Sequence, residues 1–393
     1  MRRLLPLLLL SSLVATAIVT AQTAPQNVFV VTDRPVAANE IKVGISSAQS
    51  GRASAIGADY LRGARAYFER LNTKEGGVHG RKVKLIAYDD RFEPLAAILN
   101  TRRLINEDKV FALLNYNGGV GARAVGQLIS DAQLPLIGAF TGLPALRQPL
   151  NRYLFNVRPS FNDETAAIVE RLITDRQTTK IAVFYQTDLD GESILGGVQR
   201  ALRGRGMSVA SSAAVVRNSV DVNAAVESFL ANRPDAIVLG TTYGPAAALV
   251  QRLKARGFSP VFCATSFVGA EAFFEAAGAD ADGTFITQVV PSPADPAMRI
   301  TTSFSEDMKA ANEVGSTHAA LEGYLNAAVL AQGFRDTGPS LNTAAFVRTM
   351  EGMNVDLGGP VVTFTPSSRQ GLKEIYLSAV RQGQIVKVEN FNP

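Results

Sequence analysis

The chain has 393 residues, which is long for one compact domain and predicts two or three. Hydrophobic residues make up 47% of it and charged residues 19%, a composition that excludes an intrinsically disordered chain. The formal charge is only +4 and no long Lys/Arg-rich stretch occurs, which argues against a nucleic-acid-binding surface. Two His and one Cys exclude a zinc site of the usual Cys/His type and any internal disulfide.

The N-terminus has the pattern of a cleaved export signal. Arg2-Arg3 precedes an almost wholly apolar run, Leu4–Val19, and Val19-Thr20-Ala21 supplies the small residues that a signal peptidase recognises. The run is short for a membrane-spanning helix, which disfavours the alternative of a membrane anchor. We predict a signal peptide over residues 1–21, a loose leader over 22–39 and, because no Cys lies near the cleavage site, no lipid anchor.

Strands and helices alternate through the next 250 residues or so. The first block predicts strands at Ile41–Ser46, Lys82–Tyr88, Val110–Leu114 and Leu136–Ala139, and helices at Asp59–Asn72, Pro94–Asn106 and Gly121–Ala132. The second predicts helices at Thr165–Asp175, Ser193–Gly204, Val222–Asn232 and Ala246–Gly257, and strands at Lys180–Tyr185, Ala236–Gly240 and Val261–Ala264. Such alternation indicates parallel sheets covered on both faces. We predict an α/β fold with two doubly wound lobes, 40–158 and 159–289.

The last third breaks this alternation. It predicts three helices, Met298–Asn312, Thr317–Asp336 and Ala344–Glu351, and then two strands, Gly358–Thr365 and Lys373–Val380, joined by a polar turn. These elements must pack on the two lobes, so the chain crosses between them more than once and forms a hinge beside a cleft. We assign a return segment, about 290–354, to the first lobe and a C-terminal β segment, about 355–393, to the second.

Ligands of open α/β sheets bind beyond the carboxyl ends of the strands, so the loops there are the candidate site. These loops are rich in Gly, Ser, Thr and aromatic residues and hold few charges. The loop Asn117–Gly121 runs into a predicted helix, so its backbone N–H groups suit a carboxylate, although a plain tight turn uses glycine equally well. The candidate ligand-binding residues are Gln49, Tyr116, Asn117, Gly118, Gly119, Val120, Phe140, Thr141, Gly142, Asp188, Asp190, Thr242, Tyr243, Phe267 and Val268.

Catalytic motifs are missing from the sequence. It holds no P-loop, no G-x-S-x-G elbow and no complete G-x-G-x-x-G. His79 and His318 fit solvated or capping positions, and Cys263 fits a buried apolar strand. Asp89-Asp90 fits a solvated, salt-bridged loop better than a metal pair. We therefore predict a protein that is not an enzyme, with no catalytic residue, metal site or cofactor.

Spaced motifs along the chain resemble one family. They are Ile41–Ile45, Ser50-Gly51, Gly63-Ala64, Gly76–Val83, Asp89-Asp90, Phe155–Pro159, Ile181–Tyr185, Arg233–Ala236, Gln288–Pro293, Leu321–Tyr324 and Asp356–Gly359. From about residue 40 to its end the chain resembles the type I periplasmic solute-binding proteins of ABC importers, in the leucine/isoleucine/valine-binding branch. The resemblance implies two lobes with three crossovers, ligand capture by lobe closure, a periplasmic location and an ABC permease as partner.

The resemblance also implies roles for single residues. The loop equivalent to Gly118–Gly121 binds the ligand carboxylate through a Ser and backbone N–H groups, but Gly119 or Val120 stands at the Ser position, so only the backbone donors carry over. Thr141 keeps a hydroxyl donor, and Tyr243 and Phe267 are expected as apolar walls, with Tyr116 as a cap. No acid stands in Ser266–Gly269 to meet an α-ammonium group, so the ligand is an α-amino acid only if Asp188 or Asp190 supplies the charge, and otherwise a solute without that group.

Two functions remain open at this point. The first is a transport receptor that binds a small amino acid or a related carboxylate or amide and presents it to a membrane permease. The second is a sensory module of the same fold that reports its ligand to a sensor kinase or chemoreceptor.

Overall fold

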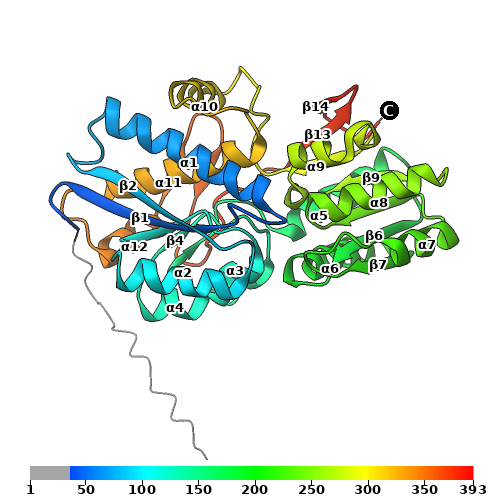
Figure 1. The fold of residues 1–393 in the computed structure, drawn as a ribbon, viewed down its shortest axis with the longest axis horizontal. Coiled ribbons are helices and arrows are strands. Elements are labelled where there is room, and N and C mark those ends of the chain that lie inside the picture. The colour runs from blue at the N-terminus through cyan, green and yellow to red at the C-terminus, as the bar shows by residue number, and fades with distance from the viewer. Residues whose placement is uncertain (1–35, 393) are drawn as a thin grey trace, which may run out of the picture.

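The computed structural model describes residues 36–392 as two α/β lobes that lie side by side (Figure 1). The predicted signal peptide and most of the predicted leader lie outside the described residues. Among the described residues, no helix has the length and apolar character needed to cross a membrane.

The first lobe is built on a parallel five-stranded sheet of order β2-β1-β3-β4-β5. Its strands are β1 (Glu40–Ser47), β2 (Lys82–Asp89), β3 (Ala112–Leu114), β4 (Leu136–Ile137) and β5 (Leu154–Phe155). Its helices are α1 (Ser54–Lys74), α2 (Pro94–Asn106), α3 (Gly119–Ala124) and α4 (Gly126–Asp131), to which α10 (Arg299–Ala310), α11 (His318–Thr337) and α12 (Thr343–Glu351) return from the far end of the chain. The central strands are buried on both faces, as parallel strands between helices must be.

The second lobe has a seven-stranded sheet of order β14-β13-β10-β9-β8-β6-β7. Its five parallel strands are β6 (Ile181–Gln186), β7 (Ser211–Val215), β8 (Ala236–Gly240), β9 (Val261–Ala264) and β10 (Phe285–Gln288). Two antiparallel strands, β13 (Tyr376–Arg381) and β14 (Gln384–Lys387), extend the sheet beside β10. The helices are α5 (Phe161–Thr174), α6 (Leu189–Arg203), α7 (Asn223–Asn232), α8 (Tyr243–Ala255) and α9 (Ala270–Ala277). The predicted fold class, two doubly wound lobes, is confirmed.

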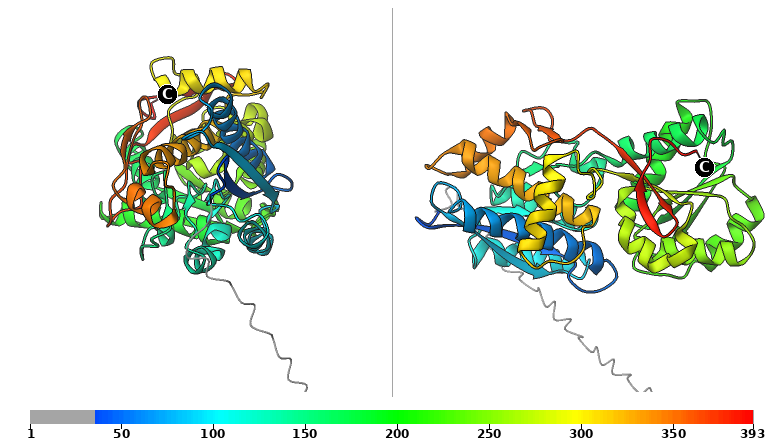
Figure 2. Two further views of the ribbon diagram at one scale, coloured as in Figure 1. Left: turned by 90° about the vertical axis from the view of Figure 1, so that its left-hand side faces the viewer. Right: turned by 90° about the horizontal axis from the view of Figure 1, so that it is seen from above.

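The chain passes between the lobes after β5, after β10 and before β13 (Figure 2, right). The first and third passages pair with each other. Asn156 N–H donates to the Arg369 carbonyl over 2.8 Å, and Leu372 N–H donates to the Val157 carbonyl over 2.7 Å. Such a short ladder resists separation of the two segments but leaves the lobes free to rotate about it, which is the geometry of a hinge.

The C-terminal third corrects the predicted strand pairing. Residues Val361–Thr363 form β12, which pairs with β11 (Asn354–Asp356) and not with the later strand β13. Val362, Phe364 and Leu372 lie in the core of the first lobe, so only the end of the predicted segment 355–393 joins the second lobe. Alternating apolar residues identify a strand but do not say which of two cores receives its apolar face. The lobe boundary at 158/159 stays a prediction.

Other differences are local. The predicted helix Gly121–Ala132 is two short helices, α3 and α4, that meet at Val125. The strands β5, β7, β10, β11 and β14 and the helix α9 lie outside the predicted elements, because most of them have only two to five residues and too few apolar positions to show a period.

Candidate functional site

The two lobes meet where their parallel strands end, and a buried carboxylate joins them. Asp190, in the first turn of α6, accepts hydrogen bonds from Gly119 N–H (2.8 Å) and from the Thr141 hydroxyl (2.5 Å). Gly119 and Thr141 belong to the first lobe and Asp190 to the second, and all three are buried. These contacts exist only with the lobes closed, so the structure is that of a closed form.

Local sequence explains how these groups are placed. Asp188 caps α6, since its side chain accepts from Gly191 N–H over 3.0 Å, and this cap sets Asp190 in the first turn. On the other side, Gly118 precedes α3 with φ +81°, a conformation that favours glycine. A Cβ on Gly119 would lie 2.5 Å from Asp190 Oδ1, so a side chain at this position would force the carboxylate to shift.

Burial shapes the electrostatics of this contact. It raises the pKa of Asp190 to about 7, and the neighbouring negative charge of Asp188 adds to the shift. Burial also raises the pKa of Asp188, which pairs with Arg217 (Nε to Oδ2, 3.2 Å), and raises the pKa of Asp90 to about 6. The Arg217 guanidinium lies 4.2 Å from the ring centroid of Phe92 in the first lobe, so it also holds the lobes together.

Aromatic rings from both lobes fill the space beside Asp190. Phe140 lies edge-on to Tyr60, with ring centroids 5.0 Å apart, and Phe267 of the second lobe lies 6.4 Å from Phe140. Phe161 packs on Phe267 at 5.7 Å. These rings are almost fully buried and form a cross-lobe apolar wall; contact of Phe267 with a ligand stays a prediction.

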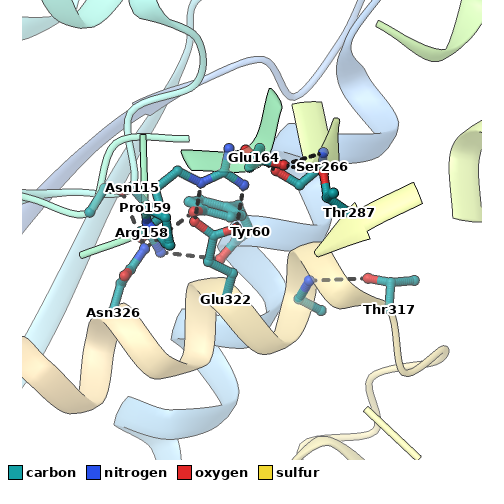
Figure 3. Close-up of polar contacts among 12 residues, drawn as sticks. Tyr60, Asn115, Arg158, Pro159, Glu164, Ser266, Thr287, Thr317, Glu322 and Asn326 are labelled. Atoms are coloured by element: carbon teal, nitrogen blue, oxygen red, sulfur yellow. Dashed lines mark hydrogen bonds and ion pairs between the residues drawn. The ribbon is translucent and has the colours of Figure 1, made fainter. Parts of the chain in front are cut away.

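A second polar cluster lies beside this wall, and the sequence interpretation missed it (Figure 3). Arg158 donates two hydrogen bonds to Glu322, over 2.8 and 2.7 Å, and its guanidinium lies 4.2 Å from the Phe140 ring centroid. Glu164 accepts from Ser266 N–H (2.7 Å) and from the Thr287 hydroxyl (2.7 Å), and burial raises its pKa. The only sequence signal was that Arg158 and Glu322 fall inside family motifs.

The structure brings together Asn117, Gly118, Gly119, Phe140, Thr141, Asp188, Asp190 and Phe267 at the lobe contact. Gln49, Val120 and Tyr243 are half-buried, Thr242 precedes α8, and Gly142 closely approaches the backbone of Phe161. Contact of any of these residues with a ligand stays a prediction.

Two predicted site residues face other partners. Tyr116 does not cap the contact, because its ring packs in the first-lobe core and its hydroxyl lies 2.7 Å from Thr101 Oγ1 of α2. Val268 packs in the core of the second lobe. Tyr116 comes two residues after β3, and Val268 ends a short 3-10 helix, Ser266–Val268, that follows β9. Position after a strand alone does not decide which way such a side chain points.

The remaining polar candidates have structural partners. His79 Nε2 lies 3.0 Å from the Arg335 carbonyl, and His318 Nδ1 lies 2.6 Å from Glu271 Oε1 across the lobes. Cys263 is buried, as predicted. Asp90 is buried as well, with its carboxylate 2.9 Å from the Ser46 hydroxyl, so the predicted solvated loop is wrong at this residue. Over residues 36–392, no group of three or more His, Cys, Asp or Glu side chains could hold a metal ion.

The raised pKa of Asp190 predicts a stability that depends on pH. The folded protein holds this proton up to about pH 7, whereas the unfolded chain releases it near 3.8, so stability falls as pH rises between these values. We expect Asp190→Asn to flatten this decline, because an amide does not titrate. Urea unfolding midpoints from pH 4 to 8 measure the effect, and parallel profiles for the two proteins would contradict the assignment.

Comparison with known proteins agrees with the fold. A sequence profile described as periplasmic binding protein matches residues 40–384. A possible leucine/isoleucine/valine-binding protein from Rhodopirellula baltica is 27% identical, with a TM-score of 0.85 over 90% of this chain and 97% of that one. A substrate-binding periplasmic protein from Ralstonia solanacearum is 30% identical, with a TM-score of 0.84 over 89% and 100%. An amino acid binding protein of Pseudomonas aeruginosa is 22% identical over 57% of this chain, and the match spans 59% of that relative's length.

Proposed function

Because the chain belongs to the periplasmic binding protein family, in its leucine/isoleucine/valine-binding branch, we propose that it is the solute receptor of an ABC importer. In this role it captures a small amino acid, or a related carboxylate or amide, outside the cytoplasm and delivers it to a membrane permease. It is a binding protein and not an enzyme. The observation that carries the proposal is the buried polar contact between two lobes at the carboxyl ends of their parallel strands.

Capture proceeds by closure of the lobes. In the open form the loops that carry Gly119 and Thr141 face water, and so does the first turn of α6. The solute docks between them, the lobes rotate about the paired hinge segments, and the aromatic wall of Phe140 and Phe267 excludes water from the ligand. Differential affinity for the closed form drives the rotation, since a ligand shifts the equilibrium only toward the state that it binds more tightly.

Thermal unfolding of the predicted mature chain, residues 22–393, tests the proposal. The protein is refolded to remove bound solute and heated with a panel of amino acids, aliphatic and aromatic carboxylates, and amides. A true ligand at a thousand times its Kd adds about 4 kcal/mol to the free energy of unfolding, which appears as a clear rise in Tm. No rise with any member of the panel would contradict the proposal. Neighbouring permease and ATPase genes would favour transport over the sensory alternative.

Thr141→Val is expected to weaken binding of the best ligand of that panel by about 10- to 100-fold without unfolding the protein. The substitution removes the hydroxyl that donates to Asp190 across the lobes, and a hydrogen bond to a charged group contributes about 1.5–3 kcal/mol. Isothermal titration measures the affinity, and circular dichroism confirms the fold. An unchanged affinity would remove Thr141 from the site.

A further inference from the structure

We propose that Asp190 takes the place of a ligand carboxylate in this receptor, which therefore selects a small amide or amine that has no carboxylate group. The inference rests on the proposed function and narrows its ligand class. The observations that support it are the use of both first-lobe donors by Asp190 and the close approach of Asp190 to Gly119.

Both donors suited to a ligand carboxylate are already used by the protein. Gly119 N–H donates to one oxygen of Asp190 and the Thr141 hydroxyl donates to the other. Thr141 Oγ1 also accepts from Leu143 N–H over 3.0 Å, which directs the hydroxyl proton toward Asp190. A ligand carboxylate would have to displace Asp190 from this place and leave its charge buried without these partners, which is costly.

The residue at position 119 is matched to this arrangement. A Cβ there would lie 2.5 Å from Asp190 Oδ1 and 2.9 Å from Thr141 Oγ1. Real Cβ atoms do not approach this closely, so any other residue would force the Asp190 and Thr141 side chains to shift. Gly119 of the first lobe and Asp190 of the second are therefore complementary, because the glycine has no side chain where the carboxylate lies.

The surrounding charge opposes a second anion. Asp188 lies two residues from Asp190 with a side chain that is only 4% exposed, and Arg217 already pairs with it. Another carboxylate would add like charge to a region of low dielectric, where Coulomb repulsion is strong. An amide or amine brings N–H donors, which carboxylates accept.

An unpaired donor at Asn117 is available to an oxygen acceptor of the ligand. Asn117 lies two residues before Gly119, is only 5% exposed, and its side-chain Nδ2 has no hydrogen-bond partner. Buried donors normally find an acceptor. The carbonyl oxygen of an amide can serve as this acceptor, while its N–H groups donate to the Asp190 carboxylate.

Isothermal titration with matched pairs tests this inference. The probes are L-leucine against L-leucinamide, and 3-methylbutanoate against 3-methylbutanamide, each at pH 7.5. We expect the wild-type protein to bind at least one amide about tenfold or more tightly than its carboxylate partner. Asp190→Ala frees Gly119 N–H and the Thr141 hydroxyl, so this preference is expected to reverse. Glu192→Ala, at an exposed position two residues further along α6, serves as the matched control and keeps the wild-type preference. Asp190→Ser is the second variant if the alanine variant does not fold.

The outcomes separate the two proposals. Tight binding of leucine or 3-methylbutanoate by the wild-type protein would uphold the receptor function and overturn the inference. An unchanged preference in folded Asp190 variants would also overturn it, because the residue would then not decide the ligand class. Binding of no probe by any of the proteins would contradict the receptor function and the inference together.

Discussion

Arg158→Met is expected to lower the free energy of unfolding by about 3–5 kcal/mol, among the largest effects of any single substitution in this protein. Arg158 and Glu322 are 1% and 3% exposed and form a bidentate ion pair across 164 positions of sequence. Removal of the guanidinium leaves the Glu322 carboxylate buried without its cation, beside the Tyr60 hydroxyl. Urea denaturation at pH 7 measures the loss.

A double variant distinguishes an uncompensated charge from lost packing. Arg158→Met with Glu322→Leu removes both charges and keeps apolar volume, so we expect it to recover much of the stability lost by either single change. If the double variant is as unstable as the sum of the two single ones, the pair contributes through packing against Phe140 and not through charge.

Gly63→Ala is expected to destabilise the first lobe by about 3 kcal/mol or more, at or above the upper end for overpacking. A Cβ at this position would lie 1.8 Å from the Ala320 carbonyl oxygen, because α1 and α11 touch through their backbones there. Gly323 on α11 also lies close to the backbone of α1, since a Cβ at Gly323 would lie 2.2 Å from the Tyr60 carbonyl oxygen. Backbone atoms cannot move aside as a side chain does, so the helices must separate.

Gly196→Ala provides the matched control for this effect. Gly196 also lies inside a helix, α6, but a Cβ there meets nothing within 4 Å. The change is therefore expected to stabilise the protein by about 0.4–1 kcal/mol, because alanine loses less backbone entropy on folding. Urea unfolding of both variants makes the comparison, and equal stabilities would show that α1 and α11 do not touch at Gly63.

The predicted helices and strands were recovered well because their signals are local. The spacing of Leu61, Ala64, Phe68 and Leu71 predicts one face of α1, and Pro94 marks the first residue of α2. The alternation of such elements along the chain was enough to predict two doubly wound lobes. The shortest strands, such as β5, carry no such period, and the lobe that receives β12 depends on packing.

The features of the candidate site also separate into those that local sequence predicts and those that depend on packing. The sequence by itself determined which loops follow the strands, that Gly119 could offer only backbone donors, and that Asp188 and Asp190 were the acids available nearby. Only the tertiary structure decided that Asp190 reaches Gly119 and Thr141, 71 and 49 positions away, and that Tyr116 turns into the core. It alone joined Arg158 to Glu322. Periodicity and capping depend on residues a few positions apart. These partners, in contrast, meet only because the two lobes close on each other, and local sequence patterns do not predict such contacts.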